Sequence, residues 1–315
     1  MTALTLEYHG GGYLTLSGEG FTARVDPRLP KREGSRGRQV PEDTTYVLVT
    51  HLDRVVFVSV LDILAETDAV LVASPEICRQ VLAELPDLPE GRWLDLGDFE
   101  RARSGHFRVT AFEQQGGGFA LGGLSAERLE ALAPEPLRGA ARNTARVARD
   151  LTNAPMRLLD SLSQLGEAIA APARAMMPFG LSGGGGSRTG FVLEIDGGPT
   201  VALFGSGLQG ERPDLDLLDD IASFAAPNLL LAAADGDRVE ALVWANRVLS
   251  PQITLLYRES DPYDPDRPRP TLPIQRFMEA IEEDSPEVEV DHLRPGDGFV
   301  TSPDLGGDDT DAAAG

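Results

Sequence analysis

Alternating apolar and polar positions open the chain and predict a set of paired strands. Residues 4–8 alternate strictly, and a period of two is typical of a strand with one buried face. The glycines at 10–12 separate this stretch from further apolar positions at 13–16, as a tight turn between two strands requires. The next apolar segment, 21–25, predicts a third strand. The start of the chain is therefore expected to form antiparallel strands.

Short apolar runs then alternate with helical patterns. The runs at 47–50 and 69–73 are rich in valine and leucine and predict buried strands. A helix is expected at 56–65. A second helix is expected to begin at Ser74 and Pro75, because serine is a favoured N-cap and proline is tolerated at the first helical position. Further strands at 93–96 and 107–112 complete this half of the chain.

The second half repeats this organisation. Two strands, 191–195 and 200–204, are expected to form a hairpin across an Asp-Gly-Gly turn. The remaining elements alternate, with helices at 214–224, 238–248 and 272–283 and strands at 228–232, 253–257 and 288–292. Two halves that each begin with antiparallel strands and continue with strand–helix alternation indicate an α/β fold, a four-layer αββα sandwich.

Residues 123–187 interrupt this pattern and predict a helical insertion. Helices are expected at 125–132 and 137–151, and a third begins at Asn153. The third helix carries an apolar stripe, which needs cover from the body of the protein, from a second subunit or from a membrane surface. We expect the insertion to act as a cap or dimerisation element, so that a protein partner or self-association through 123–187 is one hypothesis.

One predicted helix of the insertion carries a basic face. Between residues 137 and 157 there are five arginines and one acidic residue, a local charge of +4 in a chain of net charge −22. Four of them recur at helical spacing and share a face: Arg138, Arg142, Arg146 and Arg149. Such a face can bind an anionic membrane surface or a phosphorylated partner. It can equally pair with the acidic body of the same protein or stay solvated.

Composition excludes several classes of function. A net charge of −22 argues against general nucleic-acid binding, because phosphate would be repelled over most of the surface. Cys78 is the only cysteine, so neither a disulfide framework nor a thiolate metal cluster is expected. The chain shows no secretion signal and no apolar run of the roughly 20 residues that span a membrane, which predicts a cytoplasmic protein. Residues 297–315 are acidic and rich in small residues and are expected to be disordered.

Several segments, in this order and spacing, resemble the metallo-β-lactamase superfamily. The resemblance is closest to the lactonase-like hydrolases whose best-known member opens ascorbate-6-phosphate. It covers most of residues 3–122 and 188–296, and so implies one domain at 1–296 that the insertion at 123–187 interrupts. The segments are Leu-Glu-Tyr-His-Gly at 6–10, Ala-Arg-Val-Asp-Pro at 23–27, Val-Leu-Val-Thr-His at 47–51, and the stretches 190–197 and 201–208.

The family motif His-x-His-x-Asp-His, which holds two metal ions, survives here in one position only. His51 is in register, whereas Asp53 stands where the second histidine belongs. Val55 and Val56 replace the aspartate and the last histidine, and a valine side chain has no lone pair to donate to a metal. The resemblance therefore implies the fold without implying the metal site.

The later ligand positions have changed as well. The loop 113–118, where the family places a third histidine, contains none. Ser206 stands where the metal-bridging aspartate should follow Gly205, and Tyr257 and Arg258 stand where the last histidine should close a strand. A di-zinc site of the family type cannot be built from these residues. No metal cofactor is expected, and zinc is possible only at an altered site.

The remaining candidates form a remnant cleft that would accept an unknown small ligand. His51 and Asp53 are either a mononuclear or general-base pair, or a loop histidine held by a neighbouring carboxylate. His9 either lines a pocket or is a structural turn residue. Ser206 lies in Gly-Ser-Gly, but the flanking Phe204 and Leu208 break the nucleophile pattern Gly-x-Ser-x-Gly and favour a plain turn. The full candidate set is His9, Asp26, His51, Asp53, Ser206, Tyr257 and Arg258.

The leading hypothesis is a non-catalytic protein of this fold that acts as a binding, scaffolding or regulatory module. One alternative is a hydrolase of the superfamily with an altered or mononuclear metal site. The other is peripheral binding of an anionic membrane or a phosphate ligand through the arginine-rich insertion.

Overall fold

The computed structural model describes residues 3–31, 38–114, 188–205, 208, 215–235, 239–259, 273–301 and 305. Packing divides the chain into two units, one made of Met1–Gly117 with Ser187–Gly315 and the other of Gly118–Gly186. The second unit lies outside the described residues. The helices predicted in 123–187 and the face formed by Arg138, Arg142, Arg146 and Arg149 therefore stay predictions.

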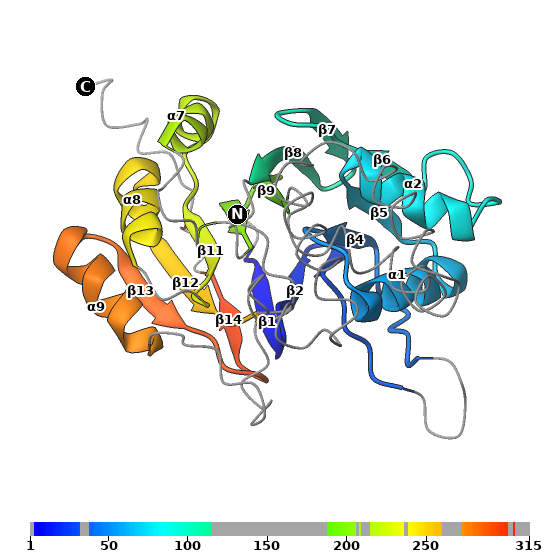
Figure 1. Cartoon of the computed structure of the whole chain (residues 1–315), viewed down its shortest axis with the longest axis horizontal. Coiled ribbons are helices and arrows are strands. Elements are labelled where there is room, and N and C mark those ends of the chain that lie inside the picture. Colours follow the sequence, from blue (N-terminus) through cyan, green and yellow to red (C-terminus); the bar gives the residue numbers. More distant parts are fainter. Residues whose placement is uncertain are drawn as a thin grey trace, which may run out of the picture. The chain divides into compact units, whose positions relative to one another are not determined.

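The first sheet has seven strands in the order β14-β1-β2-β3-β4-β5-β6 (Figure 1). The strands β14, β1, β2 and β3 pair antiparallel, and β3 to β6 pair parallel. The turn between β1 and β2 uses Gly10, Gly11 and Gly12 at positive φ, which glycine adopts without steric cost. The strands are β1 (Thr5–Gly10), β2 (Tyr13–Gly18), β3 (Phe21–Val25), β4 (Tyr46–Val49), β5 (Val70–Ala73), β6 (Trp93–Asp95) and β14 (Gly298–Val300).

The second sheet mirrors this plan, with the order β13-β12-β11-β10-β9-β8-β7. Its strands β7 to β10 pair antiparallel and β10 to β13 pair parallel. The predicted hairpin is confirmed as the pair β9 and β10. The strands are β7 (Arg101–Ser104), β8 (Phe107–Gln114), β9 (Arg188–Ile195), β10 (Thr200–Phe204), β11 (Leu229–Ala233), β12 (Ile253–Tyr257) and β13 (Glu289–His292).

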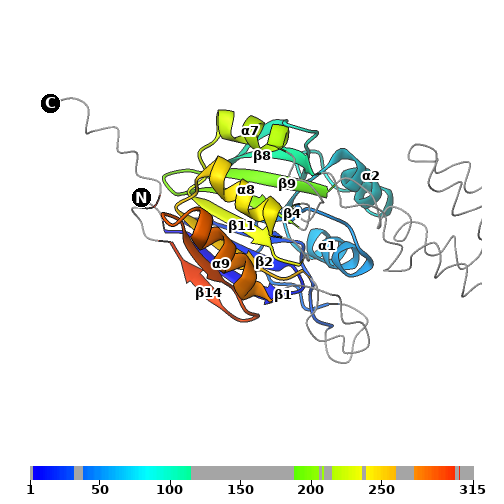
Figure 2. The same ribbon diagram turned by 60° about the vertical axis from the view of Figure 1, so that its left-hand side comes forward.

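Helices cover the outer faces of both sheets. Figure 2 shows α7, α8 and α9 along the second sheet, while α1 and α2 accompany the parallel strands of the first. The predicted start of α2 is confirmed, since Ser74 caps the helix and Pro75 opens it. The helices are α1 (Arg54–Glu66), α2 (Pro75–Glu84), α7 (Leu215–Phe224), α8 (Glu240–Leu249) and α9 (Ile274–Asp284). None of the helices in the described part of the chain is long and apolar enough to cross a membrane.

Two apolar cores separate the layers. The first lies between the sheets and joins alternate residues of both, for example Leu6 and Leu14 with Val109 and Leu193. The second lies between the second sheet and its helices, where Phe204 and Leu230 meet Leu218 and Phe277. In the central strands of the second sheet, alternate residues thus point to opposite cores, which is the pattern of a sheet buried on both faces. The four-layer αββα sandwich is confirmed for the described residues.

The expectation that residues 297–315 are disordered is wrong for their first part. Gly298–Val300 forms β14 beside β1, and Thr301 exchanges two 2.9 Å hydrogen bonds with Leu4. Phe299 packs against the core between the sheets. Strand pairing uses backbone groups, so an acidic, glycine-rich segment can still complete the edge of a sheet.

Candidate functional site

Polar residues collect where the parallel strands of both sheets end. Thr50 follows β4 in the first sheet, and Gly205 and Glu259 follow β10 and β12 in the second. A Cβ atom placed on Gly205 would lie 2.8 Å from Glu259 Oε1 and 3.5 Å from Thr50 Oγ1, so the two sheets meet at this point. In addition, the Thr189 N–H donates to the Thr50 carbonyl at 2.9 Å. The carboxyl ends of parallel strands are where ligands of open α/β sheets bind.

Asp26 anchors this region from the end of β3. Its side chain is buried, and its backbone is left-handed at φ 45°, a conformation that aspartate tolerates better than most residues. The Asp26 carboxylate accepts the Thr50 N–H at 2.8 Å and also accepts the Thr50 hydroxyl. Asp26 thereby fixes the backbone immediately before His51.

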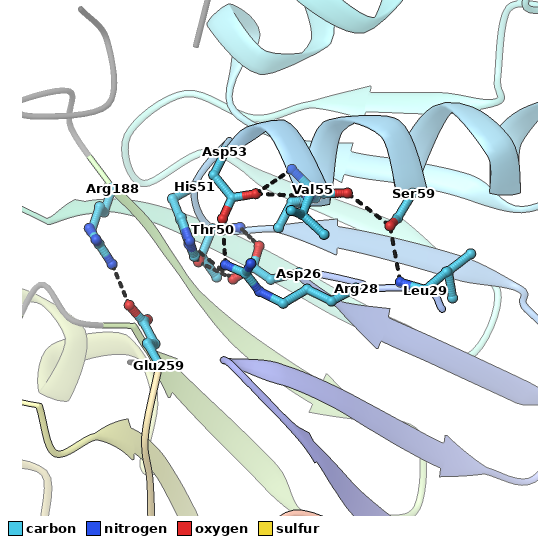
Figure 3. A network of polar contacts seen from close by, with 11 residues as sticks. Asp26, Arg28, Leu29, Thr50, His51, Asp53, Val55, Ser59, Arg188 and Glu259 are labelled. Atoms are coloured by element: carbon cyan, nitrogen blue, oxygen red, sulfur yellow. Dashed lines mark hydrogen bonds and ion pairs between the residues drawn. The ribbon is translucent and has the colours of Figure 1, made fainter. Parts of the chain in front are cut away.

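His51 contacts Asp26, which precedes β4 in the chain, whereas His51 follows it. Its Nδ1 lies 3.3 Å from Asp26 Oδ2 and 3.0 Å from Thr50 Oγ1 (Figure 3). Burial disfavours the imidazolium, but the Asp26 carboxylate outweighs this effect and raises the pKa of His51. Glu259 acts in the same direction and Arg188 opposes it. Asp26 and His51 thus form a carboxylate–imidazole pair.

Asp53 does not form the predicted pair with His51. It is the N-cap of α1, where Oδ1 accepts the N–H groups of Val55 and Val56 at 2.7 and 2.8 Å. Oδ2 lies 2.5 Å from Arg28 Nη2. Burial alone would raise the pKa of Asp53, but the Val56 N–H and Arg28 outweigh it and lower that pKa. The Asp53 carboxylate therefore caps α1, which is a common role of aspartate immediately before a helix.

An ion pair that was not predicted lies beside His51. Arg188 Nη1 at the start of β9 contacts Glu259 Oε2 at 2.7 Å (Figure 3). The two side chains are 29% and 10% exposed, so water screens the pair only partly. The two residues are far apart in sequence, and neither stands at a ligand position of the family motif. No local signal could have identified them.

Tyr257 and Arg258 are linked to this region by the hydroxyl groups of two buried tyrosines, Tyr257 and Tyr8. The Tyr257 hydroxyl donates to the Phe204 carbonyl at 3.3 Å, and the Arg258 carbonyl accepts the Tyr8 hydroxyl. Burial, reinforced by Glu259 and other nearby carboxylates, raises the pKa of Tyr257 well above its usual range. Burial also raises the pKa of Tyr8 to about 12. Both phenols are therefore neutral hydrogen-bond donors within the core between the sheets.

His9 is not among the described residues that meet around His51. His9 lies on the opposite face of β1 from Tyr8, with Nε2 2.8 Å from Thr15 Oγ1 and its ring 4.2 Å from that of Tyr13. Its contacts are those of a structural histidine. Ser206 lies outside the described residues, so its predicted turn is untested.

The side chains described do not fit the two metal ions that the family motif holds in other proteins. They contain no group of three or more His, Cys, Asp or Glu that could hold a metal ion. The lone pairs of Asp53 are used by α1 and Arg28, and Glu259 faces a guanidinium. Where the third histidine was sought, Gln114 ends β8, buried and with no hydrogen-bond partner among the described residues. The absence of a metal cofactor stays a prediction.

The Asp26–His51 contact makes a testable prediction. Replacing Asp26 by asparagine should lower the pKa of His51, because burial remains while the carboxylate is lost. Since the folded-state pKa of His51 is raised, its stabilising contribution is complete below the unfolded value of about 6.5 and is lost as pH rises through the folded value. Titration of the histidine ring signals by NMR measures this, with His9 as the internal control. An unchanged His51 pKa would contradict the pairing.

Comparisons with known proteins give the fold a context. No protein-family model and no curated protein matches the sequence. Among solved structures, the chain resembles Igni18, a metallo hydrolase from the archaeon Ignicoccus hospitalis, at 14% identity and a TM-score of 0.56, covering 95% of this chain and 99% of that one.

Two further structures agree. The metallo-beta-lactamase fold protein YhfI from Bacillus subtilis shares 9% identity at a TM-score of 0.51, covering 96% of this chain and all of YhfI. CmlA, a diiron beta-hydroxylase from Streptomyces venezuelae, shares 11% identity at a TM-score of 0.54, covering 95% of this chain and 54% of CmlA. At these identities the likeness concerns architecture, and it agrees with the sheets and helices described above. The chain therefore has the metallo-β-lactamase fold.

Proposed function

We propose that this chain is a non-catalytic protein of the metallo-β-lactamase fold that acts as a binding, scaffolding or regulatory module. One observation carries the proposal: the side chains at the strand ends are already engaged with other protein groups. His51 contacts Asp26, Asp53 caps α1, and Glu259 pairs with Arg188. Metal-assisted hydrolysis needs several donors that converge on one ion and leave a position open for water or substrate.

A hydrolase with an altered site is the second candidate. Igni18 is described as a metallo hydrolase and CmlA as a diiron enzyme, so metal-dependent chemistry occurs on this fold. The Asp26–His51 pair favours this candidate specifically, because a histidine oriented by a carboxylate is the usual form of a general base. The third candidate, binding of anionic membranes or phosphate through Arg138, Arg142, Arg146 and Arg149, depends on residues outside the described part.

Metal analysis of the full-length protein separates the first two candidates. We expect protein purified from cells grown with added zinc, manganese and iron to carry far less than one metal ion per chain. The reason is that the described donors do not converge on one point. His51→Ala should leave the metal content unchanged, as should the control His9→Ala, whose histidine lies away from the strand ends.

Stoichiometric metal that disappears in His51→Ala but persists in His9→Ala would overturn the proposal. Hydrolysis of ester, lactone or phosphodiester substrates by the metal-free protein, abolished by His51→Ala, would overturn it as well and would favour a general-base enzyme. Both measurements use the intact chain, so the insertion is present throughout.

A further inference from the structure

A buried arginine, Arg24, attaches a surface loop to the first sheet. The loop is formed by residues 39–45, which lead into β4. The Arg24 side chain is 8% exposed, its Nε donates to Thr44 Oγ1 at 2.7 Å, and its Nη2 contacts Asp43 Oδ1 at 2.7 Å. Because a buried guanidinium needs partners for its donors, these bonds hold loop 39–45 against the outer face of the sheet.

A further contact of Arg24 leads to His9. Arg24 Nη1 donates to the Tyr13 hydroxyl at 2.8 Å and to Thr15 Oγ1 at 3.1 Å. The same Thr15 oxygen lies 2.8 Å from His9 Nε2. Thr15 is 6% exposed, whereas the His9 side chain is 27% exposed and can exchange protons with water. Arg24 and His9 therefore share one buried hydroxyl group.

The shared hydroxyl group fits a neutral His9. A guanidinium can only donate hydrogen bonds, so Thr15 Oγ1 accepts from Arg24, and the Thr15 hydrogen is available to His9 Nε2. A protonated imidazole would donate from Nε2 as well, and the Thr15 oxygen would then accept from two cations at once. The two positive charges would repel each other in a region that water reaches poorly.

The other groups around His9 do not remove this conflict. Glu7 Oε1 lies 3.6 Å from His9 Nδ1, but the Glu7 side chain is 53% exposed. On the other side of β1, β14 carries no titratable residue, and Asp297 in the turn before it accepts the Arg294 N–H at 2.8 Å. Burial and Arg24 together lower the pKa of His9 more than Glu7 raises it.

We propose that His9, Thr15 and Arg24 form a pH-sensitive switch, which loosens loop 39–45 when His9 is protonated. Two positive charges on the Thr15 hydroxyl weaken the hold of Arg24 on the loop. Since the folded-state pKa of His9 is lowered, the stabilising contribution of neutral His9 is complete above the unfolded value of about 6.5. It is lost as pH falls through the folded value. The loop precedes β4 whereas His51 follows it, so this switch and the proposed function are tested separately.

NMR of the full-length protein between about pH 8 and about pH 5 tests the switch. The side-chain Nε–H signal of Arg24 should shift with the midpoint of the His9 ring, which is separate from that of His51, whose pKa is raised. The Thr45 N–H, which donates to the Thr22 carbonyl at 2.9 Å, should lose protection from hydrogen exchange over the same range, relative to the intrinsic rate at each pH. The loss should reach about tenfold for each unit by which the His9 pKa lies below 6.5.

Two variants interrupt the switch and a third serves as the control. His9→Gln keeps a hydrogen-bonding side chain that does not titrate, so the protection of the loop should become independent of pH. Thr15→Val keeps the shape of the side chain but removes the shared hydroxyl, so His9 should titrate without a response from Arg24. Thr22→Val should behave like the wild type, because Thr22 lies on the same face of β3 as Arg24 but contacts the loop through its backbone N–H.

Three results would overturn the proposal. The first is a wild type in which the Arg24 signal and the protection of Thr45 do not change across the His9 midpoint. The second is a response that persists in His9→Gln, and the third is a response of Thr15→Val equal to that of the wild type. If Thr15→Val does not fold, His9→Gln decides by the same criterion.

Discussion

Replacing Asp26 by alanine is expected to lower the free energy of unfolding by about 3–5 kcal/mol, the largest effect that we expect at the strand ends. The Asp26 carboxylate accepts both the N–H and the hydroxyl of buried Thr50 and lies 3.3 Å from His51. Alanine would leave these groups without an acceptor in a region that water reaches poorly. It would also place a residue with little tolerance for the left-handed backbone at φ 45°.

Urea unfolding at neutral pH, followed by circular dichroism, measures this loss. Asp196→Ala is the control, because that carboxylate contacts Arg103 at 2.7 Å but is 47% exposed, whereas Asp26 is buried. The control should lose no more than about 1 kcal/mol. Asp26→Gly separates the two causes, since glycine removes the backbone strain and keeps the loss of the carboxylate. A loss at Asp26→Ala no larger than the control would show that Asp26 does not hold this loop.

The layers of the fold could be predicted because their signals are local. Strict alternation identified β1, and the Ser74–Pro75 pair identified the start of α2. Both depend on residues that contact their own sequence neighbours or one apolar core. Strand β7 was missed because Arg101–Ser104 carries no apolar pattern, and its pairing with β8 arises only in the folded chain.

The candidate site could be predicted only in part. His51 and Asp26 were both among the candidates, but sequence proximity suggested Asp53 as the partner of His51. The chain enters α1 at this point, and the N-cap geometry turns the Asp53 carboxylate toward the N–H groups of Val55 and Val56. Arg188 and Glu259 were missed because their contact is made by the tertiary fold, across the ends of two strands. Sequence periodicity carries no information about such a contact.

Gly190 in β9 gives the second large prediction. A Cβ atom at this position would lie 2.2 Å from two ring atoms of Phe112 and 2.4 Å from Gln114 Nε2. Phe112 is fully buried, and its ring centroid lies 4.9 Å from that of Phe204, so it has little room to move. Gly190→Ala is therefore expected to cost about 3 kcal/mol of unfolding free energy through overpacking.

Gly298 provides the control for Gly190, and the comparison isolates the cause. Gly298 is also a strand glycine without positive φ, but a Cβ atom there would meet nothing nearer than the Leu6 carbonyl at 3.8 Å. Gly298→Ala should change the unfolding free energy by no more than about 0.5 kcal/mol, because alanine by itself suits a strand at least as well as glycine. Gly190→Ala combined with Phe112→Leu should recover part of the loss, since leucine lacks the clashing ring atoms. Equal stability of the two alanine variants would mean that Phe112 does not occupy the space beside Gly190. The position of β9 beside β8 would then depend on backbone pairing alone.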